Sequence, residues 1–141
     1  MYSKMTWNNN MWFTGELDGH KIDIDASKDF KGQNKGPTPK GLLLIALMGC
    51  TGMDVVSLLE KMKVKIDSFY MDTQTDVTET HPKVFKDITL TYYFSGNLDN
   101  NINDIKKAIN LSQEKYCGVS AMLKKNSNII VKVMVNGKEV K

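Results

Sequence analysis

The stretch PKGLLLIALMGCTGMDVVSLLEKM, residues Pro39–Met62, decides the fold. Thr38 is a suitable N-cap and Pro39 suits the first helical position, so the sequence predicts one long helix over Pro39–Met62. Its first half contains the uninterrupted apolar run Leu42–Met48, which leaves no polar face. A helix that is apolar all round is buried on all sides. Because this helix is roughly 35 Å long, one small domain would struggle to cover it, and we expect a homodimer.

Strand patterns lie on both sides of this helix. The Asp18-Gly19 pair between two short apolar runs is a strong hairpin signal. Strands are expected at Met1–Trp7, Met11–Leu17, His20–Ile24, Val64–Val77, Val84–Phe94 and Ile129–Val135, and further helices at Ile102–Tyr116 and Val119–Lys125. The order is then β-β-β-α-β-β-α-α-β. Clustered strands favour an α+β fold in which antiparallel sheets wrap a long buried central helix, within a single domain over residues 1–141.

Charge and composition narrow the classes of partner. The chain has 141 residues, with 19 basic and 16 acidic side chains, and every basic one is a lysine. Without arginine, the bidentate contacts to guanine and phosphate are missing, so we expect no nucleic-acid partner. Met1–Thr14 lacks an apolar leader core, and the longest apolar run falls short of the ~20 residues that span a bilayer. We therefore expect a cytoplasmic protein without a membrane partner.

The two cysteines, Cys50 and Cys117, are the candidate functional residues. In a reducing cytosol, cysteines are more often catalytic, metal-binding or simply buried than joined in structural disulfides. Gly49 and Gly52 flank Cys50 and each costs about 1 kcal/mol in a helix interior, which indicates close packing or free space beside the sulfur. Cys117 precedes the predicted helix Val119–Lys125, whose N-terminus would lower the pKa of the thiol. For each cysteine a small buried side chain remains the alternative.

A metal centre is not expected from the sequence. Besides the cysteines, the ligands of suitable softness are His20 and His81, and no C-x-x-C or H-E-x-x-H spacing occurs. We also expect no bound cofactor, since no glycine-rich phosphate loop is present.

The sequences around Cys50 and Cys117 resemble the OsmC/Ohr family of thiol-dependent hydroperoxide reductases. The motifs that carry the resemblance are Gly36–Pro39 with Leu42–Leu44, Ala46–Ser57, Pro82–Phe85 and Leu111–Val119. The Gly19-His20 pair near the third strand resembles a Gly-His pair that the YhfA-like branch of this family carries at the same place. The resemblance extends over nearly the whole chain.

The resemblance implies an OsmC-like fold and an intertwined homodimer in which two central helices pack against each other. It implies that Cys50 is the peroxidatic thiol, which attacks an organic hydroperoxide or hydrogen peroxide in oxidative stress defence. Cys117 would be the resolving thiol, which closes a disulfide. An external thiol or a lipoyl protein would then reduce that disulfide.

The chain departs from the peroxidases that it resembles. Those enzymes use an arginine from the N-terminal region and a glutamate near the start of the central helix, whereas this chain has no arginine and begins its helix Pro39-Lys40-Gly41. Lys40 could act only on a partner's cysteine. The alternatives are therefore a dimeric binding or thiol protein without peroxide turnover, and a structural dimer with two inert thiols.

Overall fold

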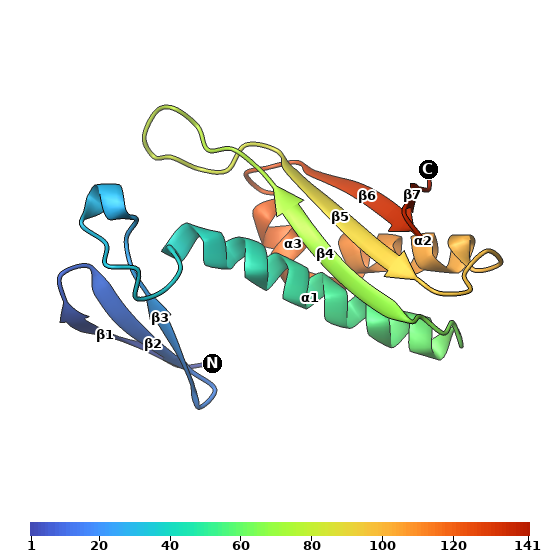
Figure 1. The fold of residues 1–141 in the computed structure, drawn as a ribbon, viewed down its shortest axis with the longest axis horizontal. Helices are drawn as coiled ribbons and strands as arrows, with labels where there is room; N and C mark the ends of the chain where they lie inside the picture. The colour runs from blue at the N-terminus through green and yellow to red at the C-terminus, as the bar shows by residue number, and fades with distance from the viewer. The chain divides into compact units, whose positions relative to one another are not determined.

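The computed structural model describes all residues, Met1–Lys141, which form two compact units, residues 1–45 and 46–141. The elements in chain order are β1 (Ser3–Asn9), β2 (Trp12–Leu17), β3 (His20–Ile24), the 3₁₀ turn η1 (Lys28–Phe30), α1 (Pro39–Lys61), β4 (Ser68–Gln74), β5 (Ile88–Ser95), α2 (Ile102–Leu111), the π-turn η2 (Ser112–Tyr116), α3 (Gly118–Leu123), β6 (Ile129–Val135) and β7 (Lys138–Glu139) (Figure 1). The α+β fold and the predicted order are confirmed, with η1 and β7 as additions.

The first unit contains an antiparallel sheet of order β1-β2-β3. Asp18 and Gly19 have φ angles of 51° and 78°, so the predicted hairpin turn is present. Met5, Gly15 and Ile22 lie directly opposite one another across the three strands and thus share one face. Met5 and Ile22 keep 53% and 44% of their surface exposed. This sheet therefore carries apolar side chains that the first unit does not cover.

A buried carboxylate organises the loop that leads to α1. Asp25 is 2% exposed, and its side chain accepts backbone N–H bonds from Ala26, Gln33 and Lys35 at 2.8, 2.9 and 3.2 Å. The hydrogen bond from Gln33 is the main reason why the pKa of Asp25 lies below its usual value. The polar stretch before α1 thus has a defined conformation around one side chain.

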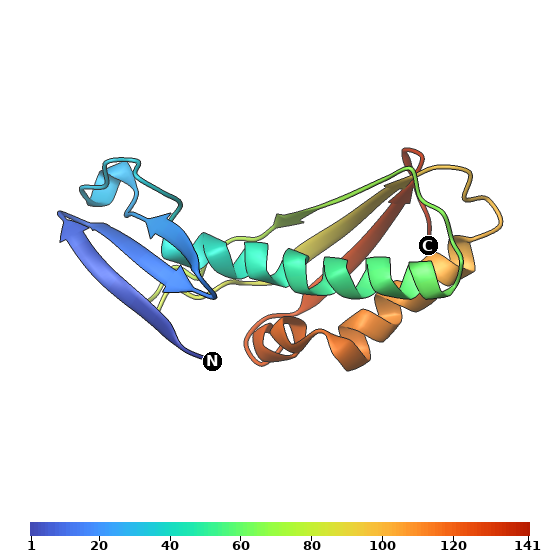
Figure 2. The ribbon, with the colours of Figure 1, turned by 90° about the horizontal axis from the view of Figure 1, so that it is seen from below.

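The second unit packs its helices on one face of a sheet of order β4-β5-β6-β7 (Figure 2). The expectation of purely antiparallel sheets is wrong at one pair, because β5 and β6 run parallel. The chain between them passes through α2 and α3, and a helical crossover of this kind is what joins parallel strands. Asn136 and Gly137, with φ of 49° and 81°, form the hairpin that adds β7.

Helix α1 is buried along one stripe only. The fully buried side chains of this stripe recur every four residues at Leu47, Thr51, Val55 and Leu59. Apolar side chains elsewhere on the helix remain exposed in the single chain; they include Leu43, Ile45, Met53 and Val56. By length and composition α1 could also cross a membrane, a test that core helices of soluble proteins pass as well.

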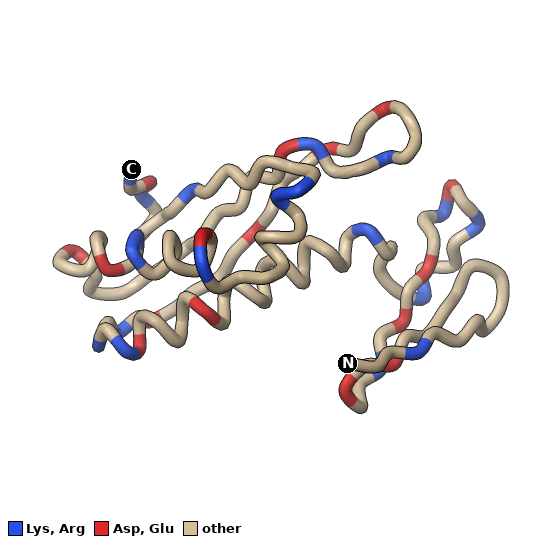
Figure 3. Tube along the Cα trace, turned by 180° about the vertical axis from the view of Figure 1, so that it is seen from behind, with Lys and Arg blue, Asp and Glu red and all other residues tan.

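Charged residues are distributed over both units without a lysine-only stripe. Lysines and acidic residues are interspersed along the trace (Figure 3). This distribution agrees with the interspersed charges of the sequence.

Candidate functional site

Two glycines beside Cys50 on α1 have different surroundings. A Cβ atom built on Gly52 would lie 2.6 Å from the terminal carbon of Met71, so this glycine lets α1 approach β4 closely. A Cβ atom on Gly49 would meet no atom within 4 Å. The sequence predicted either close packing or free space next to Cys50, and the structure has one on each side.

Cys117 is held by the turn between α2 and α3. The π-turn η2 ends where the backbone N–H of Cys117 donates to the Ser112 carbonyl at 2.8 Å. The backbone of Cys117 is extended, and its sulfur accepts a hydrogen bond from the N–H of Ser120 at 3.3 Å. The thiol therefore caps the N-terminus of α3, as the sequence indicated, and is 3% exposed.

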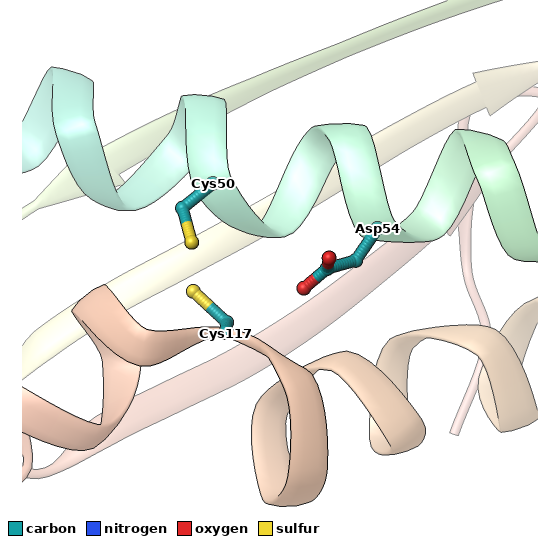
Figure 4. A group of neighbouring side chains, drawn as sticks. All are labelled: Cys50, Asp54 and Cys117. Atoms are coloured by element: carbon teal, nitrogen blue, oxygen red, sulfur yellow. The ribbon is translucent and has the colours of Figure 1, made fainter.

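The two cysteines meet despite their separation in the sequence. Figure 4 shows their sulfurs directed at each other from α1 and from the turn before α3, with Asp54 beside them. Cys50 Sγ, Cys117 Sγ and a carboxylate oxygen of Asp54 all lie within 4.8 Å of one another. Both thiols are free. The two sulfurs thus lie close together, as the disulfide implied by the family resemblance requires.

Asp54 was missed by the sequence analysis. It lies four residues after Cys50, a spacing that places two side chains on the same face of a helix. That spacing was the available signal, but an acidic residue in a helix is most often solvated. The approach of Ser112 and Cys117 distinguishes Asp54 from solvated acidic residues.

A buried network of hydroxyl and amide groups supports the carboxylate. Ser112 donates to Asp54 at 2.9 Å and lies 2.7 Å from the hydroxyl of Thr51. Thr51 also contacts the hydroxyl of Tyr92 at 2.7 Å, and the Gln113 amide donates to both Thr51 and Tyr92 at 3.1 and 2.9 Å. Burial raises the pKa of Tyr92 to about 12, so this phenol stays protonated at physiological pH. The network thus joins α1, β5 and η2 through neutral groups and one carboxylate.

The electrostatics of the site favour a protonated Cys50. Burial, first, and then Cys117 and Asp54 raise the pKa of the Cys50 thiol, while a hydrogen bond from the backbone of Val119 lowers it in part. Two consecutive backbone N–H groups at the start of α3 thus donate to the sulfurs, that of Val119 to Cys50 and that of Ser120 to Cys117. The Asp54 carboxylate and the burial of the sulfur disfavour the thiolate form of Cys50, and the backbone N–H of Val119 favours it.

We expect alkylation of Cys50 to rise with pH along a curve whose midpoint lies above that of an ordinary cysteine. A raised pKa keeps the proton on sulfur to higher pH, and only the thiolate reacts. Asp54→Asn removes one negative charge that raises this pKa, so its midpoint should fall below that of wild type. Iodoacetamide labelling across pH, with peptide mapping of each cysteine, gives both curves. Asp99→Asn, at an exposed position, is the control, and an unchanged midpoint in Asp54→Asn would exclude the carboxylate.

The other residues considered from sequence lie outside this cluster. His20 and Lys40 are exposed and belong to the first unit. Although no metal centre was expected, Cys50, Asp54 and Cys117 together offer three groups that could hold a metal ion.

The comparisons with known proteins agree over nearly the whole chain. The family model described as OsmC-like protein matches residues 32–132. Protein YhfA of Escherichia coli is 32% identical over 130 residues, 92% of this chain and 93% of the relative. A hypothetical protein of Aquifex aeolicus has a TM-score of 0.85 at 25% identity, over 98% of this chain and 97% of that one. An organic hydroperoxide resistance protein OsmC of Legionella pneumophila shares the fold, with a TM-score of 0.71 at 19% identity over 95% and 96% of the two chains.

Proposed function

The chain belongs to the OsmC-like protein family, and from this premise we propose that it is a thiol-dependent peroxidase that reduces hydroperoxides through Cys50 and Cys117. A solved relative that shares the fold is named an organic hydroperoxide resistance protein. The observation that carries the proposal is the approach of the two sulfurs to within 4.8 Å.

The proposed cycle begins at Cys50. Its thiolate attacks the O–O bond, which leaves a sulfenic acid on Cys50, and the departing oxygen takes up a proton to become an alcohol, or water when the substrate is hydrogen peroxide. The Cys117 thiol then attacks the sulfenic sulfur, and a disulfide forms with loss of water. An external dithiol, such as a lipoyl protein, then reduces the Cys50–Cys117 disulfide to two thiols and is itself oxidised to a disulfide.

The geometry suits the second step. A disulfide bond is about 2 Å long, so the sulfurs need to move together by no more than about 3 Å. Gly118 follows Cys117, and a Cβ atom built on it would meet no atom within 4 Å. The turn before α3 thus has room to follow the sulfur.

The test is the rate at which reduced wild-type protein consumes hydroperoxide. The protein, freed of metal by a chelator, is mixed with cumene hydroperoxide or hydrogen peroxide, and free thiols are counted over time against free cysteine at the same pH. We expect both cysteines to be consumed together, faster than free cysteine, and to be restored by a dithiol. Oxidation no faster than that of free cysteine contradicts the proposal.

A binding or thiol protein without peroxide turnover is the second candidate function. The observations that favour it are the absence of arginine and the raised pKa of Cys50, which leaves little thiolate near neutral pH. Slow oxidation in the preceding experiment would support this function instead. In either case a reducing cytoplasm is the proposed location, because it keeps both thiols free.

We also propose that the protein is a homodimer and predict its mass in solution. Besides the exposed side chains of α1, the first unit has an apolar groove of about 410 Å³ lined by residues that include Met5, Ile22 and Leu42. Soluble monomers rarely leave contiguous apolar surface of this kind in water. Sedimentation at micromolar concentration should give about twice 15.9 kDa. A folded monomer at that concentration would overturn the prediction.

A further inference from the structure

We infer that the reduced protein binds one soft divalent cation of the Zn²⁺ class through Cys50, Asp54 and Cys117. Two sulfurs and one carboxylate oxygen converge within 4.8 Å of one another, from α1 and from the turn before α3 (Figure 4). Thiolate and carboxylate are ligands that Zn²⁺ accepts, and three protein ligands with an open fourth position are a common zinc arrangement. The site shares both sulfurs with the proposed peroxidase, but metal binding needs no peroxide.

The separations are close to those of a metal site. With Zn–S of about 2.3 Å and Zn–O of about 2.1 Å, neighbouring ligand atoms of a tetrahedron lie roughly 3.5–4 Å apart. The three atoms therefore need to close by about 1 Å. Cys50 and Asp54 are one helical turn apart on α1, so they present a fixed pair to which Cys117 adds the third ligand. Cys50 and Asp54 are half-buried, which leaves a path for the ion and for a water at the fourth position.

The charges around the site also favour a cation. The one ion pair of the structure joins Lys124 to Glu114, so Asp54 has no lysine or histidine partner. Its carboxylate faces two sulfurs and accepts one hydrogen bond from Ser112. A divalent cation would supply the missing positive charge and replace the protons of the two thiols, which leave as two H⁺ for each Zn²⁺ bound.

The surrounding residues form a second set of contacts that orients the carboxylate. Ser112 is completely buried and is itself held by Thr51, which in turn contacts Tyr92 and Gln113. Hydrogen bonds of this type fix the direction of a ligating group and sustain its affinity. Asp54 is thus oriented toward the sulfurs before any ion arrives.

Anaerobic titration of the reduced, metal-free protein with Co²⁺ tests the inference. We expect a thiolate-to-cobalt charge-transfer band and the visible bands of tetrahedral cobalt, both saturating at one ion per chain and both lost when Zn²⁺ is added. Cys50→Ser and Cys117→Ser should lose the charge-transfer intensity of one sulfur. Asp54→Ala and Ser112→Ala should weaken binding about 10- to 100-fold, whereas Asp99→Asn should bind like wild type.

A second measurement does not depend on the folding of any variant. Wild type that has been oxidised to the disulfide has no free sulfur, so it should give no charge-transfer band. Equal binding by the oxidised form or by Cys117→Ser, or no band in the reduced protein, would overturn the inference. The peroxide assay is run with a chelator, and the cobalt titration is run without peroxide. Failure of the peroxidase proposal therefore does not decide the metal-binding proposal, and failure of the metal-binding proposal does not decide the peroxidase proposal.

Discussion

We expect that replacing Cys50 by serine removes rapid hydroperoxide consumption and that replacing Cys117 by serine leaves one round of it. In Cys50→Ser the attacking sulfur is absent, so the rate should fall by roughly two orders of magnitude or more, as when a nucleophile is deleted from an enzyme. In Cys117→Ser the peroxide should still oxidise Cys50, but the second thiol that would trap the sulfenic acid is absent. Consumption should therefore stop after one equivalent, unless a second equivalent of peroxide oxidises the sulfenic acid irreversibly to sulfinic acid.

Mass spectrometry of the two variants after one equivalent of cumene hydroperoxide measures this difference. A sulfenic Cys50 is expected in Cys117→Ser, with sulfinic acid only when a second equivalent is added, and unmodified protein is expected in Cys50→Ser. Each variant serves as the control for the other, because the chain has two cysteines. Fast consumption by Cys50→Ser would reverse the roles, which is a real alternative because Cys117 lies at the N-terminus of α3.

Thr51→Val should lower the free energy of unfolding by about 1–3 kcal/mol, the range for leaving buried polar groups without a partner. Valine keeps the shape of threonine but removes the hydroxyl that contacts Tyr92, Ser112 and Gln113. Thr51 is completely buried, so water cannot replace it. Chemical denaturation of the reduced protein, at fixed protein concentration, measures the change.

Two further variants separate the network from the general cost of a substitution. Thr89→Val, at a half-buried position of β5, should change stability by no more than about 0.5 kcal/mol. Tyr92→Phe removes another member of the network, and its cost should not add to that of Thr51→Val because the two hydroxyls share one interaction. Full additivity would mean that the contact contributes nothing to stability.

Local patterns predicted the elements of this fold well. The start of α1 at Pro39 follows from proline chemistry, and the Asp18-Gly19 hairpin follows from two residues that tolerate positive φ. The family resemblance, which rests on contiguous motifs around the two cysteines, is confirmed by the family model and by a relative of 32% identity. Each of these signals lies within a few neighbouring residues.

The remaining features depend on contacts between distant parts of the chain. The parallel pairing of β5 with β6 is decided by where the crossover returns, and the alternation of each strand reads the same in either direction. Asp54 resembles a solvated acidic residue until Ser112 and Cys117 approach it. The π-turn before Cys117 has no sequence signature, although it sets the position of the sulfur.

The two glycines that flank Cys50 are constrained by different neighbours. Gly49 borders open space within the single chain, on the exposed side of α1 that the proposed homodimer would cover. Any residue larger than glycine at position 52 requires the end of the Met71 side chain to shift. Positions 52 and 71 should therefore covary among related chains, with bulk at one accompanied by a smaller or differently placed side chain at the other, whereas no contact within the chain links position 49 to either.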